Sequence, residues 1–500
     1  MGNSGGNIVV CSCEDSMPLD AKAIRKGCQG VGLTTASALC RAEIDRFRSI
    51  AREETPLTIA CTQETALFDE VAEEVGRQTP IVYANIRESA GWSHEAAQAG
   101  PKMAALIAAA AEPLPAVPML TLDSAGVLLI YGCDERAVEA GNLLKQHLDI
   151  TVLLKPPAAI AVSRGTEFPI AKGSIRDAKG TLGAFDLTVD DFAHSVPSSR
   201  ARLTFGATRN GARSHCDVIL DLSGLPALFS AADLRDGYVR ADPDDPAAML
   251  KAVLKARDLV GTFEKPRYIT FDDDLCAHAR SRIVGCSRCL DLCPTGAIAP
   301  AGNHVEINPH ICAGCGQCAA VCPTGAAAYA LPPVDALMRK LRTLLTTYRA
   351  AGGERAVVLL HDETHGRDLI DALARHRSGL PANVLPLGLN EVTQTGIETI
   401  AAAFAYGACA LRLLLRARPR HDVVGLRRTL ALAEPILVGL GFGTGCIATI
   451  ETDDPDALAL LHRIRSEENA DISLSIEKMI QHRACVARFI QSLLNGSPDP

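Results

Sequence analysis

ICAGCGQCAAVCPTGA, residues 311–326, is the stretch that decides how this chain is organised. Its cysteines are Cys312, Cys315, Cys318 and Cys322, and a proline follows the last of them. Two residues between successive cysteines allow a tight turn to bring three thiolates onto three corners of one cubane cluster. Gly314 and Gly316 give the backbone the freedom that this turn needs. The fourth cysteine is carried away by the next helical turn, so it is available to a second cluster.

This spacing is that of bacterial ferredoxins, in which two [4Fe-4S] clusters exchange their fourth ligands. A partner run lies upstream in CSRCLDLCPTGAI, residues 286–298, and repeats the CPTGA ending. Ile283 stands where the repeat calls for a first cysteine, and Cys276 is the nearby replacement. We therefore assign one cluster to Cys276, Cys286, Cys289 and Cys322, and the other to Cys293, Cys312, Cys315 and Cys318.

Two alternatives stay open for this cysteine-rich segment. Pairs of the C-x2-C type also build tetrahedral zinc sites, although a doubled C-x3-C-P ending is not typical of them. The alternative for Cys276 is a buried structural thiol, which would leave the first cluster incomplete.

Composition excludes several classes of function. The chain has 500 residues, 18 cysteines and a formal net charge of −8, without a basic run that would neutralise phosphates, so we expect no nucleic-acid partner. The longest uncharged apolar run, residues 400–411, is too short to span a membrane. The beginning of the sequence lacks the pattern of a secretory signal, so we expect a cytoplasmic protein whose cysteines ligate cofactors rather than form disulfides.

Hydrophobic periodicity predicts a multidomain α/β protein with an inserted α+β ferredoxin-like dicluster module. The segment between residues 172 and 202 is polar, and we expect it to be irregular. The predicted parts are an α/β cysteine-containing domain over 1–115, an α/β nucleotide-binding-like domain over 120–265, the 2[4Fe-4S] ferredoxin module over 266–332, a further α/β domain over 333–465, and a helical tail and linker over 466–500.

A second set of cysteines lies near the amino terminus. Cys11 and Cys13 stand at the end of the first predicted strand, Cys61 ends another, and Cys40 lies between them. The ends of parallel strands converge on one edge of a sheet, where ligands collect, so these thiols could meet. The alternative is that they are small buried hydrophobic residues.

These segments also carry a family resemblance. CSCEDSMPLD (11–20), LCRAEIDRF (39–47) and ACTQETALFDEVAEE (60–74) resemble the amino-terminal domain of the flavin-containing component of heterodisulfide reductase. In that family a flavin domain follows, and a ferredoxin module also belongs to the chain. The resemblance implies that Cys11, Cys13, Cys40 and Cys61 hold a further iron–sulfur cluster.

The flavin domain of that family is where this chain departs from the pattern. The corresponding strand runs into YGCDERAVEAG, residues 131–141, in which Gly132 and Ala137 fill the first and third glycine positions but Asp134 takes the second. An acidic side chain there repels a pyrophosphate at the start of the helix. We therefore expect a degenerate nucleotide site without FAD, and Cys133 as a packing residue.

Three functions are consistent with these patterns, and no catalytic residue is assigned in any of them. The first is an electron-transfer protein or subunit that relays electrons between redox partner proteins, and so is an electron carrier or oxidoreductase subunit rather than a stand-alone enzyme. The second is a flavin- or nicotinamide-linked oxidoreductase of the heterodisulfide reductase type. The third is an accessory or maturation factor for formate dehydrogenase, because similar iron–sulfur proteins are found near genes of that enzyme; formate dehydrogenase or another dehydrogenase is then the expected partner.

Overall fold

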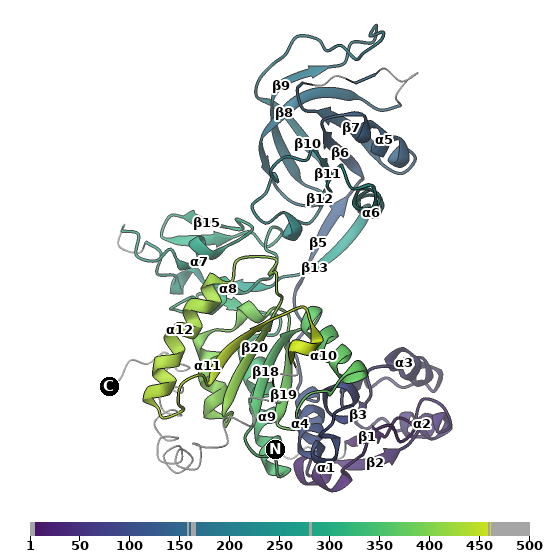
Figure 1. Cartoon of the computed structure of the whole chain (residues 1–500), viewed down its shortest axis with the longest axis vertical. Helices are drawn as coiled ribbons and strands as arrows, with labels where there is room; N and C mark the ends of the chain where they lie inside the picture. The colour runs from purple at the N-terminus through teal and green to yellow at the C-terminus, as the bar shows by residue number, and fades with distance from the viewer. Residues whose placement is uncertain (1–5, 158–159, 162–166, 280–282, 459–460, 462–500) are drawn as a thin grey trace.

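The computed structural model describes residues 6–157, 160–161, 167–279, 283–458 and 461, and it is a mixed α/β structure with several separate sheets (Figure 1). The helical tail and linker predicted for 466–500 lie outside the described residues. Among the described residues, no helix combines the length and the hydropathy that a membrane span requires.

The amino-terminal part is a parallel four-stranded sheet of order β2-β1-β3-β4. Central strand β1 is buried at Ile8, Val9 and Val10, as expected of a parallel strand that is covered on both faces. Its strands are β1 (Asn7–Cys11), β2 (Gly32–Ala36), β3 (Leu57–Ala60) and β4 (Ile81–Tyr83). Its helices are α1 (Ala21–Gly27), α2 (Ile44–Ala51), α3 (Thr65–Glu74), the π-helix η1 (Arg87–Gly91), the 3-10 turn η2 (Ala96–Gln98) and α4 (Gly100–Ala110).

The second part is a seven-stranded mixed sheet of order β10-β9-β8-β7-β6-β11-β12, at the top of Figure 1. Two antiparallel strands, β5 (Met119–Ser124) and β13 (Gly261–Pro266), connect it to the rest of the molecule. Its strands are β6 (Val127–Gly132), β7 (Asp149–Leu154), β8 (Ile170–Lys179), β9 (Phe185–His194), β10 (Ala212–Cys216), β11 (Val218–Leu222) and β12 (Tyr238–Arg240). Its helices are α5 (Glu135–Leu144), η3 (Ala232–Leu234) and α6 (Pro246–Arg257).

The prediction that residues 172–202 are irregular is wrong, because β8 and β9 pair there as an antiparallel ribbon. In β9 the buried residues alternate with more exposed ones, starting from Phe185 and Leu187. In β8 the register shifts between Lys172 and Ser174 and again between Ile175 and Asp177. Such irregularities break the strict alternation of period two, so a simple sequence pattern does not reveal the strand.

The cysteine-rich segment forms a small module between the two larger bodies. Its first and last strands, β14 and β17, pair antiparallel. Along the chain, a hairpin of β15 and β16 connects its two short helices, and these helices contact each other. The elements are β14 (Ile269–Phe271), η4 (Asp273–Leu275), α7 (Arg288–Leu292), β15 (Ile298–Ala301), β16 (His304–Ile307), α8 (Gln317–Ala320) and β17 (Ala327–Tyr329).

The carboxyl-terminal body is a parallel sheet of order β19-β18-β20-β21. The apolar run 400–411 is divided between two elements, because helix α11 covers its first part and buried strand β20 begins at its end. The strands are β18 (Val357–Asp362), β19 (Val384–Leu389), β20 (Ala410–Leu415) and β21 (Ile447–Glu451). The helices are α9 (Val334–Ala350), α10 (His365–His376), η5 (Val392–Gln394), α11 (Ile397–Ala405), α12 (Val424–Gly439) and α13 (Pro455–Leu458).

The first and last bodies share hydrophobic cores. Ala105 and Ala109 of α4 join the core that contains Leu341 and Leu345 of α9. Lys102, on the same helix α4, is fully buried, and its Nζ donates a hydrogen bond to the carbonyl oxygen of Pro381 at 2.9 Å. Burial lowers the pKa of Lys102 to about 7.

Lys102 therefore predicts a pH-dependent stability. Between its folded pKa of about 7 and its unfolded value near 10.4, the unfolded chain binds more protons, so the contribution of Lys102 to stability rises with pH, by up to about 1.4 kcal/mol per unit. The free energy of unfolding of Lys102→Met should exceed that of wild type by the largest amount at pH 6.5. This difference in stability, measured by denaturant unfolding, should shrink toward pH 9.5. Lys251→Met, at an exposed position of α6, serves as the control. A pH-independent difference for Lys102→Met would contradict the assignment.

Candidate functional site

The cysteines of the module lie on two similar turns. Cys289 is on α7 and Cys318 is on α8, while Cys293 directly follows α7 and Cys322 lies two residues after the end of α8. Gly314 and Gly316 both have φ near +75°, in the left-handed region that favours glycine. A Cβ atom at Gly314 would lie 2.6 Å from the ring of Tyr268, so this turn also requires the absence of a side chain.

One group of thiols joins cysteines from both runs. Burial, together with the nearby thiols of Cys286, Cys322 and Cys276, raises the pKa of Cys289 to about 11. Cys276 is buried, and Cys289 and Cys322 pack against the same small hydrophobic cluster. The structure thus brings together the four residues that were assigned to the first cluster.

The second group has the complementary composition. Burial raises the pKa of Cys318 well above its usual value, and the thiols of Cys315, Cys312 and Cys293 add to this effect. Burial likewise raises the pKa of Cys315 to about 12. Cys289 of the first group also acts on Cys318, so the two groups adjoin.

Backbone N–H groups point at several of these sulfur atoms. The pKa of Cys322 is lowered, because hydrogen bonds from Ala327, Thr324 and Ala326 outweigh the opposing effect of burial. The amide of Ala327 lies 3.5 Å from the Cys322 sulfur. Such donors stabilise a thiolate and tune a metal centre that the thiolate holds.

The described thiols are not drawn together as closely as the ligands of a bound zinc ion. Four thiolates around one zinc ion lie about 3.8 Å apart, since each Zn–S bond is about 2.3 Å long. Within the described parts of the chain, only the exposed carboxylates of Asp272, Asp273 and Asp274 bring three potential ligand atoms within 4.8 Å of one another.

Both neighbouring bodies hold the module in place. From the carboxyl-terminal body, Thr393 donates a hydrogen bond to the carbonyl oxygen of Cys315 at 2.6 Å, and Asn390 donates to the Tyr329 hydroxyl at 2.7 Å. From the seven-stranded body, Arg235 donates to the carbonyl oxygen of Thr295 at 2.6 Å. The loops that carry the cysteines are thus fixed from two sides.

Comparison with known protein families agrees with this geometry. Residues 255–326 match the 4Fe-4S dicluster domain family. The chain carries a ferredoxin-type iron–sulfur domain. Domains of this kind bind [4Fe-4S] clusters and transfer electrons. A search of curated proteins found no significant match to the chain.

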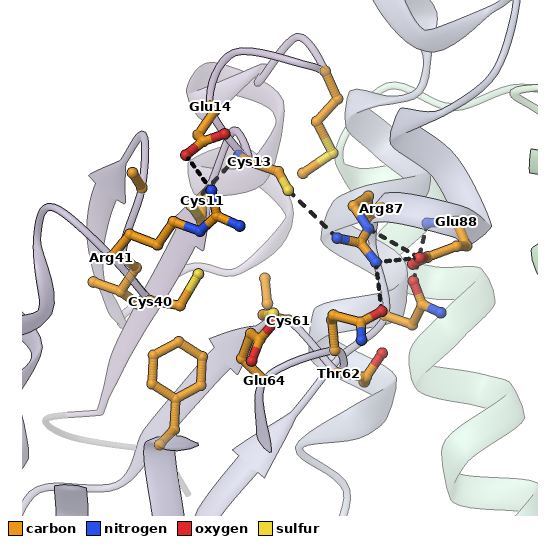
Figure 2. A pocket seen from close by; sticks show the side chains of 17 residues that line it. Cys11, Cys13, Glu14, Cys40, Arg41, Cys61, Thr62, Glu64, Arg87 and Glu88 are labelled. Atoms are coloured by element: carbon orange, nitrogen blue, oxygen red, sulfur yellow. Dashed lines mark hydrogen bonds and ion pairs between the residues drawn. The ribbon is translucent and has the colours of Figure 1, made fainter. Parts of the chain in front are cut away.

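A cavity in the amino-terminal body is lined by the second set of predicted cysteines, Cys11, Cys13, Cys40 and Cys61. It has a volume of about 120 Å³ and opens at the carboxyl edge of β1 and β3 (Figure 2). Burial raises the pKa of Cys40, and the thiols of Cys61 and Cys11 contribute. Cys13 lies on the other side, next to Arg87. All four amino-terminal cysteines of the prediction therefore line one cavity.

The backbone at this cavity is unusual in two places. Cys13, Glu14 and Asp15 have φ angles of 54°, 57° and 59°, so three successive non-glycine residues adopt the left-handed conformation. Each such residue costs roughly 1–2 kcal/mol, and strain of this kind clusters at functional sites. The opposite wall is the π-helix η1, which contributes Arg87 and Glu88. π-Helical turns are rare and are frequently found at functional sites.

An ion-pair network that no sequence motif predicts lies at the edge of this cavity and consists of Arg87, Glu88 and Arg375. Their segment NIRESAG carries no recognised spacing, and Arg375 comes from α10 in the carboxyl-terminal body. The residues meet only through the packing of the two bodies, so no local signal marks them.

The segment that was expected to be a degenerate nucleotide site forms a capped helix start in this structure. Asp134 caps α5, and its side chain accepts a hydrogen bond from the amide of Arg136 at 3.0 Å. It also forms an ion pair with the Arg136 side chain at 2.6 Å. The carboxylate thus occupies helix donors that a pyrophosphate would need. That FAD is not bound stays a prediction.

The turn around Gly314 yields a test of the module. Gly314→Ala should lower iron incorporation strongly, because the new Cβ meets the Tyr268 ring in addition to the cost of a positive φ. Gly302→Ala has a similar φ of +71° and nothing within 4 Å of the added Cβ, so it serves as the matched control and should keep its iron. Anaerobic iron analysis of both variants measures the difference; equal iron contents would show that the Tyr268 contact does not matter.

Proposed function

We propose that this chain is an iron–sulfur electron-transfer protein or subunit that relays electrons between redox partner proteins through two [4Fe-4S] clusters. The observation that carries the proposal is the pair of adjoining groups of thiols, each made of cysteines from both runs. Because each run supplies one ligand to the other's group, neither site can assemble without the whole module.

The ligand sets of the proposal follow these groups. Cys276, Cys286, Cys289 and Cys322 would hold one cluster, and Cys293, Cys312, Cys315 and Cys318 would hold the other. A bound [4Fe-4S] cluster accepts and returns one electron. The chain itself excludes water through burial of Cys318 and Cys276, and supplies N–H donors to sulfur, as at Cys322. Adjoining groups permit an electron to pass between the two sites.

We propose a third iron–sulfur centre in the amino-terminal cavity, held by Cys11, Cys13, Cys40 and Cys61. Soft thiolates are suitable ligands for iron–sulfur clusters, and four of them line this cavity. Amides of Gln63 and Glu64 donate to Cys61, which opposes the rise in pKa that burial causes. The strained backbone at Cys13 is a further sign of a functional site.

We favour an electron relay over a flavin-linked oxidoreductase. The acidic cap at Asp134 occupies the position of the nucleotide phosphates, so the seven-stranded body offers a poor flavin site. The redox partners of the relay are proteins in this proposal, and a dehydrogenase such as formate dehydrogenase is one candidate that the resemblance suggests.

The dicluster assignment predicts a defined loss of iron. Cys315→Ser should remove about four irons per chain, because a serine oxygen is a poor replacement for a soft thiolate. Cys409→Ser is the matched control, since Cys409 lies before β20 and donates to the carbonyl oxygen of Ala356. Iron and acid-labile sulfide are measured on anaerobically purified protein. Zinc in place of iron, or no acid-labile sulfide, would refute the proposal.

The third centre is tested separately. Wild-type chain should carry about twelve irons, and Cys13→Ser should reduce this number to about eight, because only the amino-terminal site loses a ligand. Cys28→Ser is the control: Cys28 belongs to the same body but donates to the carbonyl oxygen of Ala104 and does not line the cavity. An unchanged iron content in Cys13→Ser would rule out the third centre and leave the dicluster assignment intact.

A further inference from the structure

One cationic side chain reaches an amino-terminal thiol. Arg87 Nη1 lies 3.4 Å from the sulfur of Cys13, and the side chain of Arg87 is only 15% exposed. Its guanidinium also lies over the ring of Trp92, 4.4 Å from the centroid. A cation with so little contact with water acts more strongly on a nearby thiolate than a surface cation does.

A buried carboxylate fixes the position of Arg87. Glu88 is 4% exposed, and its Oε1 accepts from Arg87 Nε at 2.9 Å and from Arg87 Nη2 at 2.5 Å. The same oxygen accepts from Arg375 Nη2 at 2.6 Å. The Gln63 side-chain oxygen accepts from both guanidinium groups at 3.0 Å. The Trp92 ring also lies beneath Arg375, at 5.5 Å.

The network joins two parts of the molecule. Arg375 belongs to α10 of the carboxyl-terminal body, where the Asp371 carboxylate also lies near it, whereas Arg87 and Glu88 belong to the amino-terminal body. The cation that contacts the Cys13 sulfur is Arg87 itself. The position of the Arg87 guanidinium therefore depends on how these two bodies pack.

We infer that Arg87 raises the reduction potential of the centre held by the amino-terminal cysteines, and that Arg375, acting through Glu88, holds Arg87 in position. This inference rests on the proposed third centre. Reduction transfers one electron from a donor protein to the centre, and no bond forms or breaks. The centre becomes more negative by one charge, so a hydrogen-bonded cation stabilises its reduced form. Arg375 is a positioning residue in this scheme, whereas Arg87 acts on the centre through its contact with the Cys13 sulfur.

The test is a redox titration of the full chain, followed by electron paramagnetic resonance. The signal that Cys13→Ser lacks identifies the amino-terminal centre. Arg87→Gln should shift the midpoint potential of this signal to a more negative value while about twelve irons remain, and Arg87→Lys should restore part of the shift. Arg375→Gln should shift it in the same direction by a smaller amount, since the contact between Arg87 and Cys13 remains.

Arg41→Gln is the matched control. Arg41 lines the same cavity, but its side chain is 74% exposed and is paired with Glu14 at 3.1 Å, so solvent screens its charge. The potential of this variant should equal that of wild type.

Equal potentials for Arg87→Gln and wild type, with about twelve irons in each, would overturn the inference alone. A wild-type content of about eight irons would overturn both the inference and the third centre. If Arg87→Gln fails to take up iron, an unchanged potential in Arg375→Gln overturns the inference.

Discussion

Crowding of many buried and half-buried thiols in a short segment is the constraint on which the rest of the structure depends. Removal of the thiolates from water raises the pKa values of Cys289, Cys315 and Cys318, and the repulsion between neighbouring thiolates adds to this rise. Buried charge is tolerated only when it is compensated. Iron provides this compensation in a dicluster domain, so folding of the module and assembly of its clusters are coupled.

The module also connects the larger bodies. Thr393 and Asn390 reach it from the carboxyl-terminal body, and Arg235 reaches it from the seven-stranded body. Several of these contacts are made to the backbone of the cysteine loops rather than to side chains. The position of each loop, and thus of each sulfur atom, is therefore coupled to the packing of its neighbours.

Much of the candidate site could be predicted, because the spacing of cysteines within short segments of the sequence indicates which thiols lie together. The cysteine spacing predicted which thiols would come together, including Cys276, although no periodic pattern places it there. The edge of the first sheet was predictable in the same way, since Cys11 ends β1 and Cys61 directly follows β3. That either set binds iron through these residues stays a proposal; the family match supports a dicluster domain over residues 255–326 as a whole.

The other site residues could not be predicted from the sequence, because they meet only through contacts between distant parts of the chain. Arg87 and Arg375 are separated by most of the chain and meet only at a packed interface, where Glu88 joins them. Strand β8 was missed for another reason, because its register shifts obscure the alternation that marks a strand. Polar residues in β8 and β9 therefore resembled a loop in the sequence although they belong to a sheet.

The connection formed by β5 and β13 has an evolutionary consequence. The two strands pair from Met119 opposite Pro266 to Ser124 opposite Gly261, so the chain leaves and returns at neighbouring points, about 5 Å apart across the ribbon. A body joined to its host in this way can be acquired or deleted by recombination without tearing the surrounding fold. The seven-stranded body thus has the topology of an inserted domain.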